Sequence, residues 1–95
     1  MDEILSQWQT HRDASWPKMS NSNEGQLMTL DTVISGCVAY FLDCPDKGLD
    51  AQRLDILRSC LADLNSLLPE IEEEASHYFE RLHRLAGLLL EVSQG

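Results

Sequence analysis

Apolar residues recur at helical spacing in three separate stretches of the chain. The clearest is the C-terminal third, where apolar positions follow one another at intervals of four and three residues: Ile71, Ala75, Tyr78, Leu82, Leu85, Leu89 and Val92. Residues spaced in this way lie along one face of an α-helix. The pattern predicts an amphipathic helix over residues 69–92, and we expect the remaining chain to supply the helices that cover it.

The middle of the chain predicts two further helices, over residues 24–43 and 50–66. Their apolar positions keep the same spacing: Leu27, Leu30, Ile34, Cys37 and Phe41 in the first, then Leu54, Leu57, Leu61, Leu64 and Leu68 in and just beyond the second. The first is rich in β-branched and aromatic residues, which makes a strand the competing interpretation, but no alternation of apolar and polar residues supports a strand. Gly36 falls on the outer face of this helix, where it either weakens the helix or admits a close neighbour.

Turn and capping residues predict where these helices end. Pro45 and Gly48 interrupt the pattern between the second and third helices, and Asp50 is placed to cap the helix that follows. Pro69 is tolerated in a first helical turn, and the glutamates of residues 70–74 suit the positive end of a helix. We therefore predict that Pro69 begins a new helix rather than bending a continuous one.

The N-terminal part of the chain carries a weaker pattern. Its apolar residues form only a narrow edge: Ile4, Leu5 and Trp8. This edge predicts a short helix that Trp16-Pro17 ends, and residues 20–25 have the polar composition of a turn. We expect a single domain, residues 1–95, folded as an all-α, antiparallel up-down bundle of three main helices, with residues 1–25 loosely attached and contributing a short N-terminal helix.

The charge of the chain narrows the choice of partners. There are 16 Asp and Glu residues against 7 Lys and Arg, a formal net charge of -9. Because a nucleic acid or an anionic membrane is bound through clustered cations, and none cluster here, neither is an expected partner. The chain has no secretory signal pattern and no apolar run near the roughly 20 residues of a membrane span. We expect a cytoplasmic protein whose Cys37, Cys44 and Cys60 stay reduced.

Two Glu-x-x-His pairs are the first candidates for a metal site, and the run Glu72-Glu73-Glu74 lacks the alternating ligands and central glycine of a calcium-binding loop. Glu74 precedes His77 and Glu80 precedes His83 at the spacing that di-iron helical bundles use. Such proteins place one pair on each of two helices, whereas both pairs here lie on the same predicted helix with their histidines away from its apolar stripe. No metal or cofactor site is therefore predicted.

The cysteines are the candidates for nucleophilic chemistry. Cys37 and Cys60 fall on or beside apolar stripes, where a free cysteine usually packs as a small apolar residue. Cys44 lies in a predicted turn beside Asp43 and Asp46, which disfavour its thiolate form. No catalytic residue is predicted.

Surplus apolar surface on the C-terminal helix predicts a protein interface. Three consecutive leucines at residues 88–90 span about 200° of a helix circumference, more than one pair of neighbouring helices buries. Either another chain covers this end, or the N-terminal segment folds back over it. The predicted interface residues are Leu88, Leu90, Phe79, Trp8 and Trp16.

We therefore expect a non-catalytic protein–protein interaction module, such as a small acidic adaptor or chaperone-like protein, with homodimerisation through its C-terminal helix. The first alternative is an immunity protein or antitoxin, whose acidic surface covers the basic site of a toxin. The second, from another class, is a metal- or cysteine-dependent enzyme.

Overall fold

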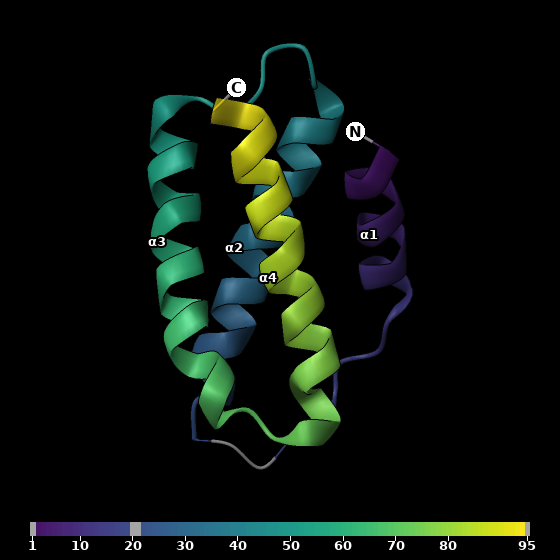
Figure 1. Cartoon of the computed structure of the whole chain (residues 1–95), viewed down its shortest axis with the longest axis vertical. Helices are drawn as coiled ribbons and strands as arrows, with labels where there is room; N and C mark the ends of the chain where they lie inside the picture. The colour runs from purple at the N-terminus through teal and green to yellow at the C-terminus, as the bar shows by residue number, and fades with distance from the viewer. Residues whose placement is uncertain (1, 20–21, 95) are drawn as a thin grey trace.

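The computed structural model describes residues 2–19 and 22–94, and within these ranges every regular element is helical. The helices are α1 (Asp2–Asp13), α2 (Glu24–Asp43), α3 (Ala51–Leu67) and α4 (Glu73–Gln94), and a 3-10 turn (Leu68–Glu70) follows α3. In Figure 1, α1 and α3 run downwards while α2 and α4 run upwards, so successive helices are antiparallel. The predicted all-α bundle is confirmed, including the helix rather than strand interpretation of residues 24–43.

The core forms where the apolar stripes of α2, α3 and α4 meet. Its buried residues keep the three-four spacing of the sequence: Leu27, Leu30, Ile34, Cys37, Val38 and Phe41 from α2, Leu57, Cys60, Leu64 and Leu67 from α3, and Ala75, Phe79, Leu82, Leu85, Ala86 and Leu89 from α4. Burying one large apolar side chain completely contributes about 1.5–3 kcal/mol. Packing of these stripes is therefore the main source of stability for the bundle.

The predicted cap of α3 is present. The side chain of Asp50 accepts a hydrogen bond from the backbone N–H of Arg53 at 2.8 Å, and this hydrogen bond lowers the pKa of the Asp50 carboxyl. Gly48, two residues earlier, has a φ of +65°, in the left-handed region that glycine adopts without a Cβ penalty. The turn between α2 and α3 thus depends on one glycine and one carboxylate.

The start of α4 differs from the prediction. Pro69 lies in the 3-10 turn that closes α3, and Ile71 then takes an extended conformation with φ -82° and ψ 133°. α4 begins only at Glu73, with Glu73 and Glu74 in its first turn. A separate helix does follow Pro69, but the chain needs the extended residue Ile71 to reverse direction before that helix starts.

The N-terminal segment packs chiefly against α4. Ile4 of α1 is buried in the core, and the Arg84 guanidinium of α4 donates from Nε to the Glu3 carboxylate at 2.9 Å. The predicted turn at residues 20–25 lies partly outside the described residues, and α2 has begun by Glu24. Loose attachment of residues 1–25 stays a prediction.

The bundle is flat, with Cα extents of 40 × 24 × 16 Å. Seen down the shortest of these axes, α4 crosses in front of α2, and α3 and α1 lie on either side (Figure 1). The side of α2 that points away from α4 therefore forms the back of the molecule.

Candidate functional site

Asp31 on the inward side of α2 joins three helices. It is the one charged residue in the stretch 27–42. Nε2 of His11, from α1, lies 2.7 Å from one oxygen of its carboxylate, and the hydroxyl of Tyr78, from α4, donates to the other oxygen at 2.7 Å. The hydroxyl of Ser35, one turn further along α2, donates to the first oxygen at 3.5 Å. A single carboxylate thus ties α1 and α4 to α2.

The ionisation states of Asp31 and Tyr78 match the hydrogen bond between them. Burial by itself would raise the pKa of the Asp31 carboxyl, but the hydrogen bonds from His11 and Tyr78 outweigh burial and leave the pKa below its ordinary value. Burial and the neighbouring Asp31 carboxylate both raise the pKa of the Tyr78 hydroxyl. At neutral pH the aspartate is therefore an ionised acceptor and the tyrosine a neutral donor.

His11 is the most enclosed polar part of the cluster. Its side chain is buried, with the residue only 5% exposed, and its ring lies 4.6 Å from the ring of Tyr78. Nδ1, the second ring nitrogen, has no hydrogen-bond partner among the described residues. Such an enclosed imidazole, held against a carboxylate and a phenol, positions α1 on the bundle.

The two tryptophans extend the cluster. The indole of Trp16 packs edge-on against the rings of Tyr78 and Phe79, at centroid distances of 5.5 and 5.6 Å, and its N–H donates to the Glu24 carboxylate at 2.9 Å. Trp8 stacks beside His11 at 6.4 Å. Both tryptophans are half-buried, so they cover α4 within the chain and retain part of their surface.

The other three predicted interface residues differ in how deeply they are buried. Phe79 is completely buried, under Trp16, and offers no exposed surface. Leu88 and Leu90 are half-buried and pack against the core, and Leu88 lines a shallow surface groove together with Glu3 and Ile4 of α1. The N-terminal helix thus covers part of the leucine-rich end, and the interface itself stays a prediction.

The outward side of α2 is exposed and carries no charge between residues 25 and 40. Its exposed residues are Gly25, Gln26, Met28, Thr29, Thr32, Gly36, Ala39 and Tyr40, followed by Asp43 at the C-terminal end of the helix. Met28 is 52% exposed and Tyr40 is 41% exposed, on a chain in which 24% of residues are charged. Depletion of charge together with exposed methionine and aromatic residues is typical of the centre of a protein interface.

The same composition gives α2 a second property. By length and composition alone, α2 is apolar enough to cross a membrane, although 33% of its most apolar 18-residue stretch is buried inside the molecule. The buried residues are core residues that contact the other helices, so α2 combines an apolar inner side with an outer side of few charges.

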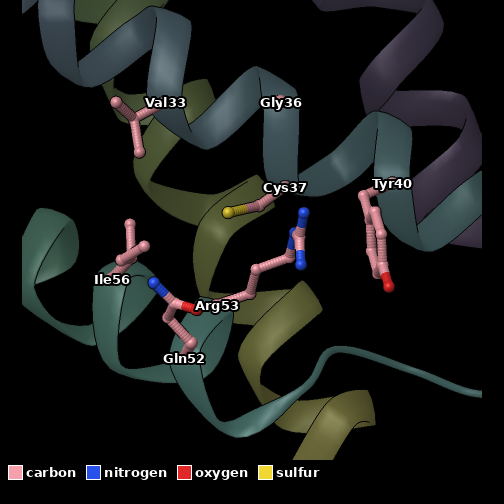
Figure 2. A pocket seen from close by; sticks show the side chains of 7 residues that line it. All are labelled: Val33, Gly36, Cys37, Tyr40, Gln52, Arg53 and Ile56. Atoms are coloured by element: carbon pink, nitrogen blue, oxygen red, sulfur yellow. The ribbon is translucent and has the colours of Figure 1, made fainter.

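A groove of about 350 Å³ runs between α2 and α3 along this outward side. Figure 2 shows that its walls come from both helices: Val33, Gly36, Cys37 and Tyr40 from α2, and Gln52, Arg53 and Ile56 from α3. Ile56 is 39% exposed, and the Arg53 guanidinium lies over the Tyr40 ring at 3.8 Å from its centroid. Burial raises the pKa of the Cys37 thiol between these walls, which keeps it neutral. The groove therefore presents mainly apolar and neutral polar groups.

Gly36 forms part of the groove wall and contributes no side chain to it. A Cβ built at Gly36 would meet no atom within 4 Å, so no part of the described chain explains why a helical glycine stands there. Glycine within a helix is about 0.8–1 kcal/mol less favourable than alanine. The sequence left two interpretations of Gly36: a residue that weakens the helix, or a position that admits a close neighbour. Because no described part of the chain lies there, such a neighbour would have to come from another molecule.

The candidate metal ligands and nucleophiles are not brought together. Among the described residues no group of three or more His, Cys, Asp or Glu side chains is placed to hold a metal ion. Nδ1 of His77 and the Glu80 carboxylate lie 4.0 Å apart on an exposed part of α4. Cys37 and Cys60 are buried and Cys44 is exposed.

Sequence reasoning missed the Asp31 cluster and the groove. Asp31 gave a usable signal, because a lone charge within residues 27–42 needs a partner if the helix is packed on that side. His11 gave none, because its neighbours in the sequence show no apolar pattern. Comparison with known proteins finds no matching family model, no matching curated protein and no matching solved structure.

Proposed function

We propose that this chain is a protein–protein interaction module without catalytic activity of its own, and that it binds through what we call the α2 face. The α2 face consists of Met28, Thr29, Thr32, Val33, Gly36, Ala39 and Tyr40 of α2 with Gln52 and Ile56 of α3. The observation that carries the proposal is a long, exposed face with few charges on a chain with a net charge of -9. The charged group within it, the Arg53 guanidinium, lies over the Tyr40 ring and is paired with Asp50.

The physical argument for binding here is the gain from covering exposed apolar atoms. Each Å² of apolar surface removed from water contributes about 25 cal/mol. Tyr40 and Ile56 line the same groove and are both exposed, so a partner packed on this groove covers apolar atoms of both helices. Tyrosine is also among the residues that most often dominate binding energy at interfaces.

A protein fits this surface better than a membrane does. Gln52 places an amide group on the α2 face, and this group can hydrogen-bond to a partner protein but loses its water partners inside a lipid layer. The overall negative charge also opposes contact with an anionic membrane.

The test compares two substitutions to glutamate in capture from native lysate. Tyr40→Glu places a charge in the α2 face, and Ala62→Glu places the same charge at an exposed position of α3 outside it. We expect the wild type and Ala62→Glu to retain the same protein at low and high salt, and Tyr40→Glu to lose it. Flotation with lipid vesicles that Tyr40→Glu abolishes, or no capture that depends on Tyr40, would overturn the proposal.

A further inference from the structure

We infer that the protein covering the α2 face is a second copy of this chain, in a two-fold symmetric dimer in which α2 packs antiparallel to α2 of the partner. This inference rests on the proposed function, because it uses the same surface. It replaces the C-terminal helix with α2 as the contact between the copies.

Charge is the first argument for a second copy. Two chains that each carry a net charge of -9 repel one another, and the repulsion is least where the facing surfaces themselves carry no charge. The α2 face comes close to this condition: the carboxylate of Asp31 is turned inward to His11 and Tyr78, and the Arg53 guanidinium in the groove is paired with the Asp50 carboxylate. A surface built to capture a basic partner would instead present its carboxylates at the contact.

Gly36 is the second argument. In a two-fold symmetric interface, residues near the axis meet their own copies, so a small residue at that point shortens the distance between both helices at once. The Gly36 position is open on the outside of α2, between Val33 and Tyr40. A glycine there lets the two α2 helices cross closely, which the lone chain has no need of.

The antiparallel arrangement follows from the ends of α2. Asp43 and Asp46 lie at or just beyond its C-terminus, where the helix dipole is already negative. A parallel pair would bring these carboxylates next to their own copies. An antiparallel pair about Gly36 places Asp43 opposite Thr29 of the partner subunit and keeps the two sets of carboxylates at opposite ends of the contact.

The size of the face fits a reversible dimer. The 20 residues of α2 extend about 30 Å, and two helices side by side are about 20 Å wide. With the two-fold axis at Gly36, the two copies of α2 overlap over residues 29–43, about 22 Å of helix. The footprint is then about 450 Å² on each copy and about 900 Å² in total, in the range of weak, reversible contacts. We therefore expect association in the micromolar range, where monomer and dimer are both populated.

Sedimentation velocity over a range of protein concentrations tests the association. The wild type should shift from monomer towards dimer as concentration rises, and Gly36→Glu should weaken the association at least tenfold. A Cβ at Gly36 meets nothing within 4 Å, so this variant should fold normally, and circular dichroism checks that it does. Ala62→Glu adds the same charge to an exposed site outside the α2 face and should dimerise like the wild type.

Disulfide trapping tests the geometry. In a Cys44→Ser background, which removes the exposed thiol, Gly36→Cys should form a dimer linked by a disulfide under mild oxidation. A disulfide needs Cα atoms about 4.4–6.8 Å apart, which the two-fold axis near Gly36 provides. Ala62→Cys in the same background should not be linked.

Four outcomes separate the two proposals. A monomer at every concentration, combined with Tyr40-dependent capture of a different protein, would overturn the dimer and leave the proposed function standing. A monomer without such capture would overturn both. A dimer that persists in Gly36→Glu but is lost in Leu88→Glu with Leu90→Glu would move the contact to α4. A dimer whose Gly36→Cys variant does not cross-link would overturn the antiparallel arrangement about Gly36.

Discussion

The two sides of α2 differ in their charged groups and in the contacts that these groups make. On the inward side, one carboxylate at Asp31 meets an imidazole from α1 and a hydroxyl from α4, so a charge is held among partners that come from distant parts of the sequence. On the outward side, around Gly36 and Tyr40, α2 carries no charge before Asp43 at its C-terminus, and a Cβ at Gly36 would meet no atom within 4 Å. The Arg53 guanidinium of α3 lies over the Tyr40 ring there. The helix thus keeps its only central charge for its own assembly and leaves the middle of its opposite side free of charge.

This difference predicts that the two sides respond to substitution in opposite ways. Removing a group from the inward side leaves enclosed polar atoms without partners, and this lowers the free energy of unfolding. Replacing a residue on the outward side removes only an exposed contact, such as that of the Tyr40 ring with the Arg53 guanidinium, so the isolated chain should tolerate it. Dimerisation should instead be weakened by substitutions on the outward side and be little affected by substitutions on the inward side that leave the chain folded.

Asp31→Ala is expected to have the largest effect on stability. It leaves Nε2 of His11 and the hydroxyl of Tyr78 without their acceptor, at about 1–3 kcal/mol for each enclosed group. We expect a loss of about 2–4 kcal/mol in the free energy of unfolding, measured by urea denaturation.

Thr32→Ala is the matched control on the next residue. Thr32 is exposed on the outward side, and its hydroxyl donates only to the Met28 carbonyl within the same helix, at 3.0 Å. The loss should be within about 0.5 kcal/mol. Equal losses at the two positions would mean that the sides of α2 do not differ as described.

Tyr78→Phe should have the next largest effect. The ring stays and only the hydroxyl that donates to Asp31 at 2.7 Å is lost, so we expect a decrease of about 1–2 kcal/mol in the free energy of unfolding. Tyr40→Phe removes the same atom from an exposed tyrosine on the outward side and should change stability little. Urea denaturation of the two variants side by side measures the difference, and a similar loss from both would contradict it.

The contrast also shows what could be predicted from the sequence. The apolar stripes and the Asp50 cap depend on residues within a few turns of one another, so their spacing alone indicated the core and the start of α3. The Asp31 cluster joins residues 20 and 47 positions apart, and no local pattern links them. Phe79 was expected at an interface because the sequence cannot show that Trp16, from the loop after α1, folds over it.

Helix boundaries show the same limit. Acidic residues correctly indicated the start of a helix after Pro69, but the chain spends residues 68–72 on a 3-10 turn and an extended segment before α4 begins. Reversal of direction between two packed helices sets that length, and it depends on where the helices lie in space. Gly36 was the one feature of the outward side that the sequence did indicate, through its place off the apolar stripe.

The dependence of stability on pH distinguishes the contribution of the Asp31 charge from that of its hydrogen bonds and shape. Because the folded-state pKa of Asp31 lies below the ordinary value of about 3.9, its ionised form stabilises the fold above that value, and this stability is lost as pH falls through the folded pKa. Asp31→Asn keeps an acceptor oxygen but cannot ionise. We expect the difference in unfolding free energy between wild type and Asp31→Asn to narrow as pH falls below about pH 4. A difference that stays the same down to pH 3 would show that the charge contributes nothing.

The smallest expected effect is a gain in stability at Gly36. Alanine at a helical position with open space around its Cβ should raise the free energy of unfolding of the monomer by about 0.5–1 kcal/mol, because the unfolded chain loses conformational freedom. Dilute protein in a thermal or urea denaturation experiment measures it. Gly48→Ala also has space for a Cβ, but its φ of +65° disfavours any side chain, so it should lose about 1–2 kcal/mol. If Gly36→Ala stabilises the monomer and also weakens the dimer, the glycine is kept for the contact between copies. If Gly36→Ala stabilises the monomer and the dimer alike, Gly36 has no role on the outward side. The contrast between the two sides then rests on Tyr40 and Ile56 alone.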